Sequence, residues 1–173
     1  MRCRSRSRHG PCRESVAMKI RTGRRDDAER LLAFWSAAAH GRSVSDDLAG
    51  VARLLRHDSE SVLVAEVDGV VVGTVIAGWG GWRCHIYRLA VSPDHRRRGI
   101  GRELLAAAEA RFVALGGRRS DAMVDDGNPG AHELYRNAGY MPDSSWSRWV
   151  RPSSRSTVMP VTRAARWGKL GGV

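Results

Sequence analysis

Residues 86–105 read IYRLAVSPDHRRRGIGRELL and predict a strand, a tight turn and a helix in succession. The apolar and aromatic run ends at Ser92-Pro93, a pair that typically follows a strand. Gly99 and Gly101 then allow the backbone to turn tightly and to approach a ligand closely. Because the amide groups at a helix N-terminus point toward bound anions, this stretch is a candidate phosphate-binding turn.

Positive charge is concentrated in the same turn, which holds Arg96, Arg97, Arg98 and Arg102. The Gly-x-Gly spacing taken alone favours a solvated basic turn capped by glycines. A Rossmann dinucleotide turn is a weaker alternative, because Leu104 occupies the third glycine position and the strand follows a long hairpin instead of opening a βαβ unit. The spacing alone therefore leaves these interpretations open.

Turn residues divide the surrounding chain into strands and helices. Asp68-Gly69 predicts a two-residue hairpin turn, because both positions accept a positive φ. Gly116-Gly117 predicts the end of a helix, and Asn128-Pro129 predicts the start of the next. The predicted elements are strands at 18–21, 61–67, 70–79, 84–91 and 122–124, helices at 26–40, 46–57, 99–115 and 129–139, and one or two strands within 140–150. This order predicts an α/β domain with helices packed against a mixed sheet.

The basic charge of the chain is unevenly distributed. The 173 residues carry 29 Lys and Arg against 18 Asp and Glu, a formal net charge of +11. Residues 1–17 contribute +4 and residues 151–173 contribute +5, which leaves residues 18–150 nearly neutral at +2. We expect a disordered basic extension at 1–17, one domain at 18–150 and a flexible basic tail at 151–173. Met18 is an alternative natural start.

Cysteine content and hydropathy limit the setting. The three cysteines, Cys3, Cys12 and Cys84, fit neither a disulfide framework nor a zinc site, which indicates a reducing, cytoplasmic location and no metal. No run approaches the ~18 consecutive apolar residues of a membrane span, so we expect no membrane partner. The basic balance and the Arg-Ser repeats of residues 1–17 keep a nucleic-acid-binding protein open as an alternative function.

Two ordered motifs resemble those of the GNAT N-acetyltransferases. Arg96-x-x-Gly99-x-Gly101 is similar to the family's acetyl-CoA motif, and NPGAHELYRNAGY at 128–140 is similar to its second motif. The matching positions in the second motif are Asn128, Ala131, Leu134, Tyr135, Gly139 and Tyr140. The chain looks most similar to small bacterial single-domain members that resemble ribosomal-protein alanine acetyltransferases. The resemblance implies an α/β (α+β) fold, with a mixed, mostly antiparallel sheet of six to seven strands flanked by about four helices.

The resemblance also implies an activity and its catalytic groups. The expected reaction is acetyl transfer from acetyl-CoA to a primary amine, by direct attack in a ternary complex. Tyr135 is expected to protonate the departing thiolate, since a phenol with a pKa near ~10 keeps its proton at neutral pH. His85 occupies the strand position where several members place a glutamate base, and is a candidate base. Water relays through backbone carbonyls, or Asp125 and Asp126, are alternatives to His85.

Acetyl-CoA is expected to lie along the motif strand. The resemblance implies that the pantetheine arm runs beside this strand as a pseudo-strand, that one N–H there serves the oxyanion, and that the pyrophosphate sits on the backbone of the glycine turn. Asn128 would contact the cofactor arm or cap the following helix. The expected cofactor contacts are Leu89, Ala90, Val91, Arg96, Arg97, Arg98, Gly99, Ile100, Gly101, Arg102, Asn128 and Tyr135.

The acceptor is the least defined partner. Asp46 and Asp47 could attract a cationic amine, or could stand at a helix start because of the helix dipole. Trp146 and Trp149 would suit the edge of a homodimer. A non-catalytic acyl-CoA sensor on the same fold is a further alternative, and nucleic acid is expected to contact the basic tails only.

Overall fold

The computed structural model describes residues 18–39, 45–145, 147 and 149; the predicted terminal segments 1–17 and 151–173 lie outside this part. The elements are β1 (Lys19–Thr22), η1 (Arg25–Asp27), α1 (Ala28–Ala38), α2 (Leu48–His57), η2 (Ser59–Ser61), β2 (Val62–Val67), β3 (Val70–Trp79), β4 (Cys84–Val91), η3 (Pro93–His95), α3 (Ile100–Ala114), β5 (Ser120–Ala122) and α4 (Pro129–Asn137). Of the described residues, 18–39 and 45–142 fall in one compact unit, and 143–145, 147 and 149 fall in a second. No helix of the described part is long and apolar enough to span a membrane.

A five-stranded sheet organises the first unit. Its strand order is β1-β2-β3-β4-β5, antiparallel throughout except for the parallel pair of β4 and β5. The α/β class and the mixed, mostly antiparallel sheet are confirmed. The expected count of six to seven strands is too high for the described residues.

The predicted final strand within 140–150 is the source of that difference. Residues 140–145, 147 and 149 contain no strand, and residues 146, 148 and 150 lie outside the described part. The Tyr140 ring packs edge-on against Tyr135, and its hydroxyl shares a 2.9 Å hydrogen bond with Ser120. These contacts hold Tyr140 against α4 and β5, and Pro142 has no N–H to give to a sheet.

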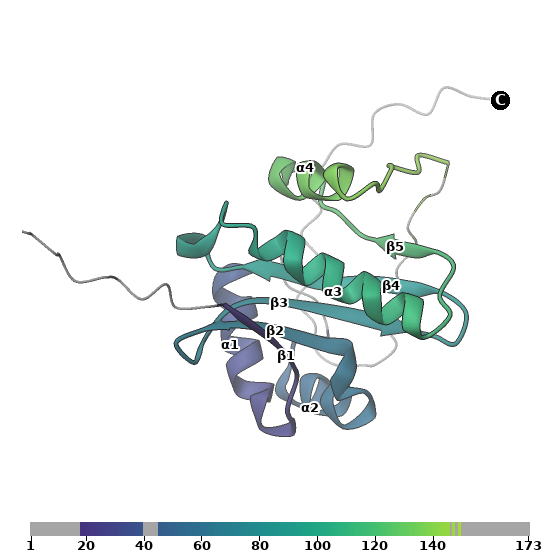
Figure 1. Cartoon of the computed structure of the whole chain (residues 1–173). Helices are drawn as coiled ribbons and strands as arrows, with labels where there is room; N and C mark the ends of the chain where they lie inside the picture. The colour runs from purple at the N-terminus through teal and green to yellow at the C-terminus, as the bar shows by residue number, and fades with distance from the viewer. Residues whose placement is uncertain (1–17, 40–44, 146, 148, 150–173) are drawn as a thin grey trace, which may run out of the picture. The chain divides into compact units, whose positions relative to one another are not determined.

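Helices cover both faces of the sheet (Figure 1). One core cluster joins α1 and α2 to β2 and β3 through residues such as Leu31, Trp35 and Leu55. The other joins α3 to the opposite face through Leu104, Leu105 and Phe112, and it includes Tyr135 of α4. One face of β4 therefore lies toward α1, and the other lies toward α3.

Local turn chemistry formed as predicted. Asp68 and Gly69 both have positive φ, 53° and 73°, in the hairpin between β2 and β3. Gly116, with φ 78°, follows the end of α3. Strand β5 starts earlier than predicted, at Ser120, because Gly117 packs so closely on Cys84 that a Cβ there would lie 2.3 Å from the sulfur. The chain is thus returned to the sheet directly after α3.

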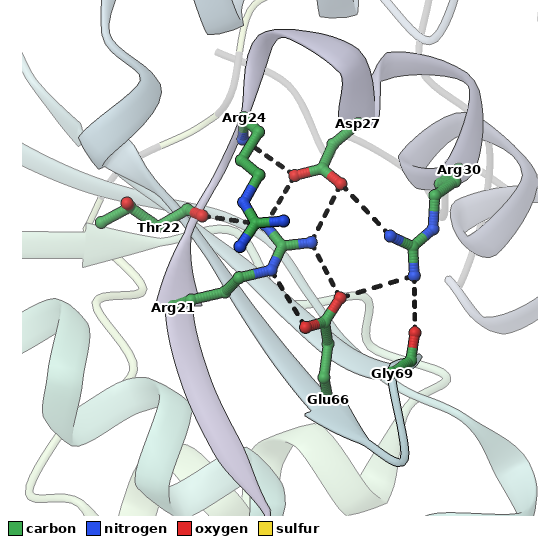
Figure 2. Close-up of polar contacts among 7 residues, drawn as sticks. All are labelled: Arg21, Thr22, Arg24, Asp27, Arg30, Glu66 and Gly69. Atoms are coloured by element: carbon green, nitrogen blue, oxygen red, sulfur yellow. Dashed lines mark hydrogen bonds and ion pairs between the residues drawn. The ribbon is translucent and has the colours of Figure 1, made fainter.

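A network of ion pairs joins β1, β2 and the start of α1 (Figure 2). The Arg21 guanidinium donates to Asp27 at 2.6 and 2.9 Å and to Glu66 at 2.8 and 3.0 Å. Burial alone would raise the pKa of Asp27, but hydrogen bonds from Arg21 and from the Arg24 N–H hold it below its ordinary value. The Arg21 hydrogen bonds likewise lower the pKa of Glu66. Asp27, which directly precedes α1, is thus the buried partner of Arg21.

Arg21→Met should remove the central cation of this network and destabilise the fold by about 3 kcal/mol at pH 7, because Asp27 would stay buried with only the half-exposed Arg30, 3.6 Å away, as a counter-ion. The carboxyls of Asp27 and Glu66 have lowered pKa values in the folded protein and titrate near ~4 in the unfolded chain. Their contribution to the free energy of unfolding is therefore complete above about pH 4, and it is lost as the pH falls through the pKa values of the folded protein. Urea unfolding of both proteins between pH 7 and pH 3 should show the difference shrinking on acidification.

Arg30→Met is the matched control. Arg30 belongs to the same network but its side chain is 48% exposed, so its removal should cost less than about 1 kcal/mol. Equal destabilisation by the two substitutions, or a difference independent of pH, would contradict the assigned role of Arg21.

Candidate active site

Strand β4 contains a bulge at its centre. Thr74 of β3 pairs with Ala90 and Ile76 pairs with Tyr87, so the single residue Val75 faces both Arg88 and Leu89. Arg88 has φ 49°, a left-handed conformation that costs an L-residue roughly 1–2 kcal/mol. The bulge bends β4 and separates its two halves.

The second half of β4 has an open edge. Strand β5 pairs only with Cys84, His85 and Ile86, so among the described residues no strand continues beside β4 after Ile86. The Ser92 N–H donates to Val72 of β3, and the alternation of an antiparallel ladder then turns the backbone groups of Val91 away from β3. We call Leu89–Val91 on this side the β4 edge.

The predicted phosphate-binding turn follows the β4 edge and opens α3. Arg97 and Gly99 have positive φ values of 63° and 86°, and α3 begins at Ile100. The turn lines a cavity of about 640 Å³ between the start of α3 and the end of α4. The lining residues of this α3–α4 pocket are Arg97, Arg98, Gly99, Arg102, Leu134, Asn137 and Ala138. The volume lies within the range of ordinary ligand and cofactor sites.

Arg96 of the first motif is not among the residues that line this pocket. Its Nε donates to the Val91 carbonyl at 3.2 Å, and its Nη2 donates to the Ala38 carbonyl at 3.4 Å. These bonds tie the end of α1 to the end of β4. In this structure the Arg96 side chain therefore stabilises the turn, and its cofactor contact stays a prediction.

Gly101 connects the β4 edge to the α3–α4 pocket. A Cβ at this position would lie 3.2 Å from Leu134 of α4 and 3.7 Å from Val91 of β4. Any larger residue would crowd Leu134, so the glycine lets the start of α3 pack against α4. Gly101 thus lies between Val91, at the end of the β4 edge, and Leu134, which lines the α3–α4 pocket.

Tyr135 lies on the buried side of α4. It is 9% exposed, and its ring meets the Tyr140 ring edge-on at 5.2 Å. Burial raises the pKa of Tyr135, and the neighbouring Tyr140 adds to the shift. The hydroxyl therefore keeps its proton at neutral pH, as a proton donor must.

His85 lies on the other face of the sheet. Its neighbours Cys84 and Ile86 belong to the core cluster under α3, so strand alternation turns His85 away from that cluster. The imidazole lies 5.8 Å from the Tyr87 ring, and its Nδ1 lies 3.9 Å from Asp121. The two predicted catalytic residues, Tyr135 and His85, therefore approach β4 from opposite faces.

The remaining predicted residues have local structural contacts. Asn128 caps α4, accepting the Ala131 N–H at 3.1 Å, which confirms its capping role and leaves its cofactor contact a prediction. Asp125 accepts the Gly127 N–H in a turn. Asp47 caps α2 through the Gly50 N–H, and the Asp46 carboxylate pairs with Arg88. Within the described residues, no three His, Cys, Asp or Glu side chains gather as a metal site requires.

Comparison with known proteins supplies the family. The family model described as "Acetyltransferase (GNAT) family" matches residues 24–140. The chain belongs to the GNAT acetyltransferases. A relative from Sodalis glossinidius, named Acetyltransferase SG1711, is 37% identical over 128 residues, covering 73% of this chain and 90% of the relative. Acetyl transfer from acetyl-CoA is the activity of this family, and the name of the relative specifies no acceptor.

Solved structures confirm the GNAT fold. Ard1 from Thermoplasma volcanium superposes with a TM-score of 0.63 at 24% identity, covering 73% of this chain and 84% of that one. The protein yncA from Salmonella typhimurium, solved with acetyl-CoA, gives a TM-score of 0.60 at 23% identity, covering 72% of this chain and 80% of that one. The GNAT resemblance predicted from the two motifs is therefore confirmed.

Gly99→Glu should weaken acetyl-CoA binding at least tenfold, about 1.4 kcal/mol, because it sets a carboxylate among the backbone amides and arginines of the turn. Gly116→Glu is a matched control at the other end of α3. Gly99 and Gly116 both have positive φ, so the two substitutions strain the backbone alike. Both positions also have room for a side chain: an added Cβ would meet no atom closer than 3.9 Å at Gly99 and none within 4 Å at Gly116. Titration calorimetry should show near-normal affinity for Gly116→Glu, and equal weakening in both variants would contradict the placement of the phosphates.

Proposed function

We propose that this GNAT acetyltransferase binds acetyl-CoA along the β4 edge and acetylates a primary amine by direct attack in a ternary complex. The observation that carries the proposal is the contact of Gly101 with both Val91 and Leu134, which sets the open strand edge beside the α3–α4 pocket. The pantetheine arm can then pair with Leu89–Val91 while the pyrophosphate reaches the amides of residues 97–102.

The reaction balances with two proton movements. The neutral amine nitrogen attacks the thioester carbonyl carbon, a C–N bond forms, and the C–S bond breaks. The amine gives up one proton and the departing thiolate gains one, which yields the amide and CoA. The carbonyl oxygen carries negative charge in between, and a backbone N–H of the β4 edge is the proposed donor to it.

Tyr135 is the proposed proton donor to the sulfur. It projects from α4 into the cluster that includes β4, and burial keeps its phenol protonated. His85, on the opposite face, is the proposed base for the amine, directly or through a water. This arrangement lets the donor and acceptor substrates approach β4 from different faces of the sheet.

Tyr135→Phe should lower kcat by about 10² while leaving the affinity for acetyl-CoA near the wild-type value, because only the proton transfer is lost. Thiol release should be followed with acetyl-CoA and a panel of primary amines that includes free peptide N-termini, a lysine peptide, a polyamine and an aminoglycoside. Since burial raises the pKa of Tyr135, wild-type kcat should show no loss from Tyr135 ionisation up to about pH 9.

Tyr140→Phe is the control for this substitution. It keeps the edge-on ring contact with Tyr135 and removes the hydroxyl that shares a hydrogen bond with Ser120. A normal kcat in Tyr135→Phe, or the same loss in Tyr140→Phe, would contradict the assignment. Binding of acetyl-CoA without thiol release for any amine would favour the non-catalytic sensor.

Two expected partners stay predictions. The homodimer edge was based on Trp146 and Trp149; Trp149 is 93% exposed, and Trp146 lies outside the described residues. Nucleic-acid contact was assigned to residues 1–17 and 151–173, which also lie outside them.

A further inference from the structure

A buried hydrogen-bond relay connects α1 to the bulge of β4. The Trp35 Nε1–H donates to the Thr74 hydroxyl at 2.9 Å, and the Thr74 hydroxyl donates to the Arg88 carbonyl at 3.0 Å. Trp35 is 4% exposed and Thr74 is fully buried. If one partner of either hydrogen bond is removed, water therefore cannot replace it.

The direction of this relay is fixed by the chemistry of its members. An indole N–H can only donate, and a carbonyl can only accept. The single proton of the Thr74 hydroxyl must therefore point at the Arg88 carbonyl. Sequence reasoning missed this relay, because the tryptophan, the threonine and the arginine come from three separate elements and form no motif.

The side chain of Arg88 is held as firmly as its carbonyl. Its guanidinium pairs with the Asp46 carboxylate, with Nε 3.0 Å from Oδ1, and lies 5.9 Å from the centre of the Trp35 ring. Both charged side chains are largely buried. The contacts of Trp35, Thr74 and Asp46 with Arg88, which we call the Arg88 clamp, offset the cost of its left-handed conformation.

The clamp also determines where the next amide points. The C=O of Arg88 and the N–H of Leu89 belong to one peptide group, and no described peptide bond is cis. In a planar trans peptide these two groups point in opposite directions. Because the Arg88 carbonyl accepts from the Thr74 side chain, the Leu89 N–H points away from that side chain, which leaves it available to a ligand at the β4 edge.

We propose that Trp35 and Thr74 are positioning residues for acetyl transfer, which aim the Leu89 N–H at the thioester oxygen through the Arg88 carbonyl. This inference rests on the proposed placement of acetyl-CoA along the β4 edge. Neither side chain touches the substrate. They hold the Leu89 N–H in place in advance. The N–H then does not have to reorient as negative charge develops on the thioester oxygen.

Thr74→Val tests the relay with a side chain of nearly the same shape and no hydroxyl. We expect kcat to fall about 10- to 100-fold, somewhat less than the 10²–10³ typical of deleting an oxyanion donor, because the amide remains but is no longer aimed. Affinity for CoA, which has no thioester carbonyl, should change little. Thr74→Ser keeps the hydroxyl and should restore most of kcat. Hydrogen exchange of residues 87–91 should accelerate in Thr74→Val.

Ser61→Ala controls for lost stability. Ser61 is a buried hydroxyl that donates to the Asp58 carbonyl at 2.7 Å and precedes β2, which does not adjoin β4. It should keep the wild-type kcat. Trp35→Phe removes only the outer bond and provides a second variant if Thr74→Val does not fold; its kcat should fall by a smaller factor.

The outcomes separate the relay from the proposed site. If Thr74→Val keeps the wild-type kcat while Tyr135→Phe loses it, the relay is overturned and the proposed site stands. An equal loss of kcat in Ser61→Ala, or a loss of CoA affinity as large as the loss of kcat, would also overturn the relay. If neither Thr74→Val nor Tyr135→Phe lowers kcat, the proposed site itself fails.

Discussion

Among the residues that the structure describes, β4 is paired on both sides at only three positions, and the rest of the candidate site depends on that limit. After Ile86 the parallel partner β5 has ended, while β3 continues and the bulge at Arg88 bends the strand. Backbone groups that would complete a sheet are then available to a ligand with an extended, amide-containing arm. The glycine turn that follows places a helix N-terminus at the far end of the same edge. One strand thus aligns the proposed places for a thioester and for a pyrophosphate.

Features that depend on neighbouring residues were predictable from the sequence. The Asp68-Gly69 hairpin, the Gly116 helix end and the Asn128-Pro129 helix start are local, because each is determined by the φ values or hydrogen bonds that those residues can adopt. The glycine turn and Tyr135 were found because they belong to motifs with fixed spacing. Local chemistry combined with family spacing therefore predicted the cofactor half of the candidate site, and its cofactor contacts stay a proposal.

Features that depend on distant partners were not predictable in the same way. The sequence allowed Asp46 to stand at a helix start for the helix dipole alone, yet Arg88 of β4 binds it, and Arg21 of β1 binds Asp27 in the same way. No glycine or proline marks the bulge in the sequence. Its left-handed residue is Arg88, which is held by Thr74 and Asp46 from distant parts of the chain. The number of strands was overestimated because the aromatic residues after α4, which resemble a strand in composition, include Tyr140 packed against Tyr135.

The central claim is that the thioester of acetyl-CoA lies against the second half of β4. Amide chemical shifts of the full chain, recorded by NMR during titration with acetyl-CoA and then with CoA, test it most directly. The account predicts that residues 89–91 and 97–102 shift with both ligands, and that Leu89 differs most between them because only acetyl-CoA has a thioester oxygen. Binding that leaves these amides unchanged while others shift would contradict it.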